Sequence, residues 1–121
     1  MLSTHVRGQH GENKACCWLE AHGYVILARN WRSRCGEVDI IAEKAGVLVF
    51  VEVKALPSGS LETLAHELGG RKQERIIETA KLFLSKHRKY SNSVIRFDVL
   101  VIDMPGFDDV YHIENAFSEQ V

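Results

Sequence analysis

Two charged residues interrupt the most apolar stretch of the chain. Residues 47–54 read VLVFVEVK, so Glu52 and Lys54 stand among aliphatic and aromatic side chains. Such a run is typical of a strand buried on both faces, and side chains two residues apart on a strand leave the same face. A buried charge without a partner is costly, so this carboxylate and this ammonium need each other or a third charge. The pattern predicts a functional site on a central strand.

Asp39 can supply the third charge. It lies in a β-rich run at residues 37–42, and the turn residues 43–46 make a hairpin that would set Asp39 beside the Glu52 end of the next strand. The two carboxylates and the backbone carbonyl of Val53 are hard oxygen ligands of the kind that suit Mg²⁺ or Mn²⁺. Such a metal centre acts on phosphate groups, and Lys54 could orient the attacking water or stabilise charge on a phosphodiester. We therefore interpret Asp39, Glu52 and Val53 as metal ligands and Lys54 as catalytic.

Helical spacing directs two more charged side chains toward the same interior. Glu12 shares one helical face with Ala15 and Leu19. Lys72 lies one turn before Ile76 on the apolar stripe of a later helix, so it should point at the sheet. Acids and lysines gathered in one interior are typical of a functional site, because a soluble domain seldom buries them otherwise.

Periodicity and turn residues predict the elements that position these groups. A helix is expected at residues 11–23, ended by Gly23, and the later apolar stripe predicts a long helix through Ile76, Ile77, Ala80, Phe83 and Leu84. Strands are expected at residues 24–30, 37–42, 47–54, 95–102 and 111–113. After a break at residues 57–59, a short helix would contain Leu61, Leu64, Ala65 and Leu68. This order is typical of an α/β protein, and no repeat or linker divides it, so we predict one domain over residues 1–121.

Composition narrows the possible partners and compartments. The 15 lysines and arginines nearly balance 16 acids, so a polyanion must be met by a local patch, for which Arg29, Arg32 and Arg34 are candidates. No apolar stretch is long enough to span a membrane, and none resembles a secretion signal. Three cysteines without a CxxC pair fit reduced thiols in the cytoplasm and argue against zinc.

The order of these motifs resembles the PD-(D/E)XK nuclease superfamily. A helix carrying Glu12 precedes GEVDI at residues 36–40 and FVEVK at residues 50–54. Within that superfamily the chain is similar to the YraN-like bacterial proteins, a largely uncharacterised family that resembles archaeal Holliday-junction resolvases. The likeness extends through the segments GQHGENKA, LARNWRSRCGEVDIIA, GRKQERI, RFDVL and HIENAF.

The resemblance implies a restriction-endonuclease-like fold, with a central mixed sheet flanked by helices in αβββαβ order. It implies Mg²⁺ or Mn²⁺ held by Asp39 and Glu52, with Glu12 as an auxiliary catalytic acid and further ligand, Lys54 as the catalytic lysine and Lys72 in a supporting role. DNA, rather than RNA, would be the substrate, and a branched substrate would favour a homodimer. One departure weakens the expected phosphate clamp, because Ala55 and Leu56 follow Lys54 where related sequences often carry a polar residue and an arginine.

Three functions remain open from the sequence: a metal-dependent endonuclease that hydrolyses DNA, an inactive nucleic-acid-binding or protein-interaction module with the same fold, and a structural ion-pair network. Simpler explanations also exist for single residues. Glu12 could be an acid favoured by the helix dipole, and Lys72 could be a solvated first-turn lysine. Asp98 could pair with Arg96 or support the metal site from behind its ligands, and the KHRK run at residues 86–89 is by default a solvated charge run.

Overall fold

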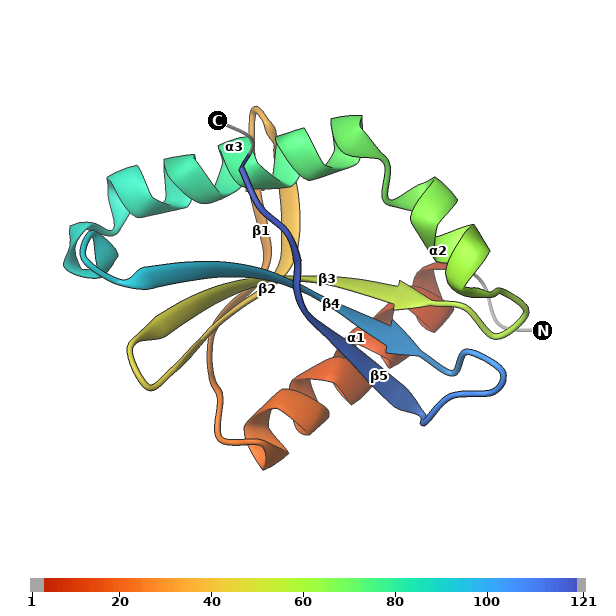
Figure 1. Ribbon diagram of the computed structural model, residues 1–121. Helices are drawn as coiled ribbons and strands as arrows, with labels where there is room; N and C mark the ends of the chain where they lie inside the picture. The colour runs from red at the N-terminus through yellow and green to blue at the C-terminus, as the bar shows by residue number, and fades with distance from the viewer. Residues whose placement is uncertain (1–3, 120–121) are drawn as a thin grey trace.

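A five-stranded mixed sheet forms the centre of the computed structural model, which describes the backbone of residues 4–119 and the side chains of residues 8–119 (Figure 1). The strands are β1 (Val25–Ser33), β2 (Gly36–Lys44), β3 (Val47–Ala55), β4 (Val94–Ile102) and β5 (Val110–Phe117), and they lie side by side in chain order. Only β3 and β4 are parallel. The connection between them contains the helices α2 (Leu61–Glu67) and α3 (Gly70–Lys86) and the short 3₁₀ helix η1 (Arg88–Tyr90). This α/β arrangement is compatible with the predicted restriction-endonuclease-like fold.

Each face of the sheet has its own apolar core. Helices α2 and α3 cover one face, where Phe50, Phe83 and Phe97 pack together, while α1 (Thr4–Ala21) covers the other, where Leu19 meets Val51. Successive residues of β3 alternate between these two cores, so β3 is buried on both faces. The prediction of a central strand is confirmed.

Several predicted boundaries were wrong. Helix α1 begins at Thr4 rather than at residue 11. Its first two turns were not predicted because glycines and polar residues there give no apolar periodicity. Gly11 is buried inside this helix because it lies against β3 and β4, where an added Cβ would be 3.5 Å from the Cβ of Ala55. Strands β1 and β5 also extend beyond their apolar runs, since backbone pairing such as Ser33 with Gly36 continues into polar sequence. Helix α2 ends at Glu67, and of the predicted apolar residues Leu64 and the capping Leu68 are buried.

Both edge strands carry an irregularity. In β1 the register shifts between Ile26 and Ala28, and Asn30 has a φ of 51°. On the opposite edge, the pairing of β4 with β5 shifts between Phe97 and Val99, and Asn115 in the bulged segment of β5 has a φ of 54°. Left-handed backbone of this kind is tolerated best by glycine and asparagine.

Among the described residues, no helix combines the length and the apolar composition needed to cross a membrane.

Candidate metal centre

The backbone pairing of β2 with β3 ends just before the charged residues Asp39 and Glu52. Its register runs from Lys44 opposite Val47 to Ile40 opposite Val51. One residue further, the side chain of Asp39 replaces the backbone as the partner of β3, and its Oδ2 accepts a hydrogen bond of 2.8 Å from the amide of Val53. The Val53 carbonyl points to the same side of the strand as its amide, so this oxygen also faces the space beside Asp39. The predicted placement of Asp39 beside the Glu52 end of β3 is confirmed.

Glu52 is a buried carboxylate on the α3 side of the sheet. Its residue is only 3% exposed, and its Oε2 lies 3.1 Å from the Nζ of Lys72 and 4.0 Å from the Nζ of Lys54. Lys72 reaches it because α3 begins at Gly70 and its first turn lies over the end of β3. The prediction that Lys72 points at the sheet is confirmed.

Asp39 and Glu52 interact strongly with each other. Burial, followed by the hydrogen bond and the negative charge of Glu52, raises the pKa of Asp39 to about 8, against the amide of Val53 and the ammonium of Lys72, which lower it. Two carboxylates in one poorly solvated place cannot both ionise cheaply, so they hold a proton or a cation between them. Asp39 therefore keeps its proton to higher pH than an exposed aspartate, and a divalent ion bound there would have to displace that proton.

Lys54 lies between two carboxylates. Its Nζ is 4.0 Å from Glu52 and 4.0 Å from Glu67, and its side chain is 22% exposed. Glu67, at the end of α2, was missed in the sequence because α2 was assigned from its apolar residues alone. In the sequence, Glu67 is marked only by its position just before Leu68 and Gly69, where the helix was expected to end. That position does not indicate which way its side chain points.

Glu12 is held elsewhere. Its Oε1 accepts hydrogen bonds from Asn30 Nδ2 at 2.7 Å and from Arg29 Nη2 at 3.3 Å, both on β1. The side chain is largely buried, as predicted, but its partners are on the edge strand. Within residues 8–119, no three His, Cys, Asp or Glu side chains are grouped to hold one metal ion. A part for Glu12 in metal binding therefore stays a prediction, and Asp39, Glu52 and the Val53 carbonyl are the oxygen groups here that could hold a metal ion.

The three predicted nucleic-acid contacts differ in their surroundings. Arg29 binds Glu12 and donates to Asn13 Oδ1 at 2.7 Å. The side chain of Arg32 is 78% exposed and lies 3.7 Å from Glu37. Arg34 is exposed in the turn between β1 and β2. Their contact with nucleic acid stays a prediction.

A second buried carboxylate, Asp98, joins the RFDVL and HIENAF segments. Its oxygens accept hydrogen bonds from Arg96 at 2.9 Å through both Nε and Nη2, from His112 Nε2 at 2.6 Å and from the Asn115 amide at 2.9 Å. Burial alone would raise the pKa of Asp98, but the donors His112, Arg96 and Asn115 together lower it. The predicted pair with Arg96 is confirmed.

This network belongs to the opposite face from Glu52. Asp98 is in register with Val51, which packs in the α1 core, and His112 contacts the ring of Trp18 on α1. Its partners among the described residues include neither Asp39 nor Glu52, so Asp98 positions neither of these carboxylates.

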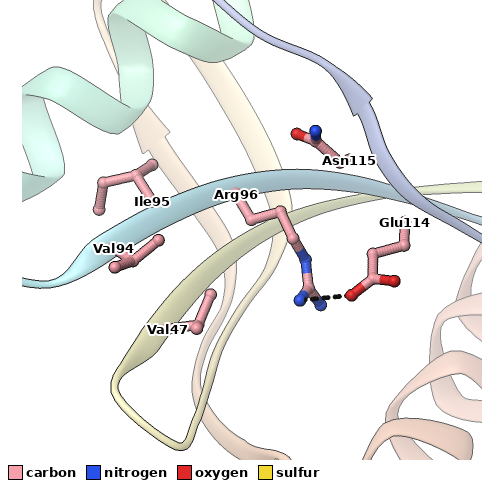
Figure 2. Close-up of a pocket in the computed structure, with 6 residues that line it drawn as sticks. All are labelled: Val47, Val94, Ile95, Arg96, Glu114 and Asn115. Atoms are coloured by element: carbon pink, nitrogen blue, oxygen red, sulfur yellow. Dashed lines mark ion pairs between the residues drawn. The ribbon is translucent and has the colours of Figure 1, made fainter.

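Arg96 also borders a surface hollow, shown in Figure 2, which is lined by Val47, Val94, Ile95, Arg96, Glu114 and Asn115. There the Nη1 of Arg96 lies 2.7 Å from Glu114 Oε1, and its Nη2 donates to the hydroxyl of Tyr24 at 2.6 Å. Every nitrogen of this guanidinium thus has a partner within the protein. The hollow offers aliphatic surface and one satisfied ion pair, without a group for catalysis.

Comparison with known proteins places the chain in a family. A model of the uncharacterised protein family UPF0102 matches residues 11–102. The chain is 46% identical over 118 residues to a UPF0102 protein of Treponema pallidum (strain Nichols), covering 94% of each. It is 42% identical over 123 residues to a UPF0102 protein of Treponema denticola (93% of this chain, 95% of that one), and 40% identical over 112 residues to one of Persephonella marina (93% of each). The chain therefore belongs to the uncharacterised family UPF0102, the YraN family that its motifs predicted.

Proposed function

We propose that the protein is a metal-dependent nuclease that hydrolyses DNA phosphodiester bonds at Asp39, Glu52 and Lys54. One observation carries the proposal: the backbone pairing of β2 with β3 ends at Ile40, and the side chain of Asp39 instead accepts a hydrogen bond from the Val53 amide, with its carboxylate close to that of Glu52. An ordinary hairpin would continue the backbone ladder there, and would gain nothing by placing two carboxylates together. The cost of that arrangement is understandable if the pair binds a cation.

The donor set fits a hard divalent ion. Two carboxylates and one backbone carbonyl are oxygen ligands, and Mg²⁺ usually keeps several waters besides one or two carboxylates. Burial and the neighbouring Glu52 raise the pKa of Asp39, so it is costly to ionise this carboxyl. A bound Mg²⁺ or Mn²⁺ would offset that cost.

The chain's own side chains would perform the remaining steps. A bound ion of this kind polarises a phosphate oxygen and lowers the pKa of a coordinated water. Lys54 is placed to orient that water or to donate to a phosphate oxygen as negative charge develops. Lys72 holds Glu52 in its orientation through their ion pair, and Asp39 must release its proton before it can act as a ligand.

Calorimetric titration with Mn²⁺ tests the proposal on wild type, Asp39→Asn and Glu52→Gln, with thermal melts of the same samples. We expect wild type to bind Mn²⁺ and both variants to lose binding while they remain folded. Glu114→Gln is the matched control, because it makes the same change at an exposed carboxylate that contacts only the Arg96 site. Cleavage of linear, single-stranded and branched DNA would then be screened with the wild type and Lys54→Ala.

A structural ion-pair network is the competing explanation, and one observation favours it. Lys72 and Lys54 already lie beside Glu52, so the cluster has cationic partners without any metal. On this explanation none of the proteins would bind Mn²⁺, while the Asp39 and Glu52 variants would melt at temperatures different from wild type. That result would remove the nuclease proposal. An inactive binding module would instead hold DNA without metal, and its affinity would survive Lys54→Ala.

A further inference from the structure

The surface on the two sides of the metal centre has opposite charge. On the β1–β2 side, the hairpin carries Arg32 and Arg34 and the first two turns of α3 carry Arg71, Lys72 and Arg75, against the acids Glu37 and Glu74. Acids predominate in the β4–β5 loop and in α2, at Asp103, Asp108, Asp109, Glu62 and Glu67, of which Asp103 is paired with Lys14. A net charge of −1 for the whole chain therefore conceals a local separation of charge.

The hairpin turn and α3 form one continuous surface. An added Cβ at Gly36 would lie 3.6 Å from the Cβ of Arg75 and 3.4 Å from the Oγ1 of Thr79, and Figure 1 shows the β1–β2 turn reaching α3. Cys35, Arg71, Glu74, Arg75 and Glu78 line a shallow hollow between them. Arg34 directly precedes Cys35 in the exposed turn, so its backbone lies next to the surface that carries Arg71 and Arg75.

Three arginines of this surface are free to bind an external anion. Arg34, Arg71 and Arg75 are exposed, and within the part of the chain whose side chains are described none has a carboxylate within 4.0 Å, whereas Arg29, Arg32 and Arg96 do. Two acids also line the hollow. Glu78 lies 3.3 Å from Lys81 and is partly neutralised, which leaves Glu74 as the acid without such a pair.

Arg71 and Arg75 present two cations on one face of α3. They are one helical turn apart, about 6 Å along the axis, so a polyanion that lies along the helix can meet both. Lys72 follows Arg71 and lies 3.1 Å from Glu52, so the surface is contiguous with the metal ligands. A strand on the other side would pass the acidic loop and be repelled.

We infer that Arg34, Arg71 and Arg75 bind the phosphodiester backbone of DNA, which enters the metal centre across the β1–β2 turn and the first two turns of α3. The inference rests on the proposed nuclease function, and it adds the surface and the direction of approach. It also explains how a chain with almost no net charge could hold a polyanion.

The test is fluorescence anisotropy with a fluorescein-labelled DNA duplex in EDTA, over a series of salt concentrations. The triple variant Arg34→Ala, Arg71→Ala, Arg75→Ala is compared with a control triple, Lys86→Ala, Arg88→Ala, Lys89→Ala, which removes the same charge at the last residue of α3 and in η1. Along the helix axis, Lys86 is about 17 Å from Arg75 and about 23 Å from Arg71. We expect the first triple to reduce the slope of log affinity against log salt by about 0.9 per contact, about 2.7 in all, and to weaken binding on the order of 100-fold at 0.1 M salt. The control triple should match wild type.

Equal losses in both triples would overturn the inference, because they would show diffuse charge rather than a defined surface. No loss in the arginine triple, or no DNA binding by wild type, would also overturn it. If that triple does not fold, the three single variants serve, each with an expected loss of about 0.9 in slope. Mn²⁺ titration separates this result from the proposed function: the arginine variants should bind Mn²⁺ like wild type, and a failure of wild type to bind Mn²⁺ rejects the nuclease without altering the contrast between the triples.

Discussion

The Asp98 network allows a prediction whose size follows from the structure. Asp98 is 1% exposed, and its two oxygens accept four hydrogen bonds. Asp98→Asn keeps the size of the side chain but converts one oxygen into an NH₂ donor. Each oxygen of Asp98 accepts from two donors, so in either orientation of the asparagine its NH₂ group would face two donors instead of acceptors. The guanidinium of Arg96 would also lose its buried counter-charge.

Removing one partner of a buried ion pair costs about 3–5 kcal/mol. Arg96 keeps Glu114 and the hydroxyl of Tyr24, so we expect the lower end, about 3 kcal/mol, with a fall in melting temperature of about 12 °C for a chain of this size. Urea unfolding at pH 7 measures the loss. Glu114→Gln is the control, because it removes an exposed partner of the same arginine and should cost less than about 1 kcal/mol.

The effect of Asp98→Asn should depend on pH. A carboxyl whose pKa is lowered by folding contributes stability above its unfolded pKa of about 3.9, and this contribution disappears as the pH falls through the folded value. The difference between wild type and variant should therefore shrink below about pH 4. A loss under 1 kcal/mol at pH 7, or a folded variant that no longer binds Mn²⁺, would refute the assignment of a structural role on the face opposite the metal centre.

Two further predictions concern the metal centre and α1. Because folding raises the pKa of Asp39 from 3.8 to about 8, the folded state alone holds its proton between these values, so the metal-free protein should lose stability as the pH rises across that window. Urea melts should show a weaker pH dependence for Asp39→Asn, and calorimetry should show Mn²⁺ affinity of wild type rising up to about pH 8. Gly11→Ala should stabilise α1 by about 0.5–1 kcal/mol, because the added Cβ would lie at ordinary contact distance from its neighbours. Gly11→Leu should overpack against Ala55 and cost about 1–3 kcal/mol. Thermal melts measure both, and a destabilised alanine variant would contradict the argument.

The metal centre could be predicted from the sequence where the geometry is local. The two-residue period of a strand sets Glu52 and Lys54 on one face, a short turn brings Asp39 to them, and helical spacing directs Lys72 at the sheet. Each inference involves one element or one hairpin.

The parts that could not be predicted depend on how distant elements meet. Spacing indicates that Glu12 faces inward, but the angle at which α1 crosses the sheet decides that it meets Asn30 on β1. The approach of Glu67 to Lys54 depends on how α2 folds back over β3. The network of Asp98 depends on the bulge in β5, which presents the Asn115 amide and which no pattern of apolar residues reveals.

The irregular edge strands limit how copies of this chain can associate. A straight, unpaired strand at the border of a sheet invites another strand to add to it, which leads to fibres or to dimers with a shared sheet. Here the register shift and left-handed Asn30 of β1, and left-handed Asn115 of β5, interrupt the row of backbone donors and acceptors on each border. These interruptions make the addition of a further strand to either border less favourable than it would be on a regular edge.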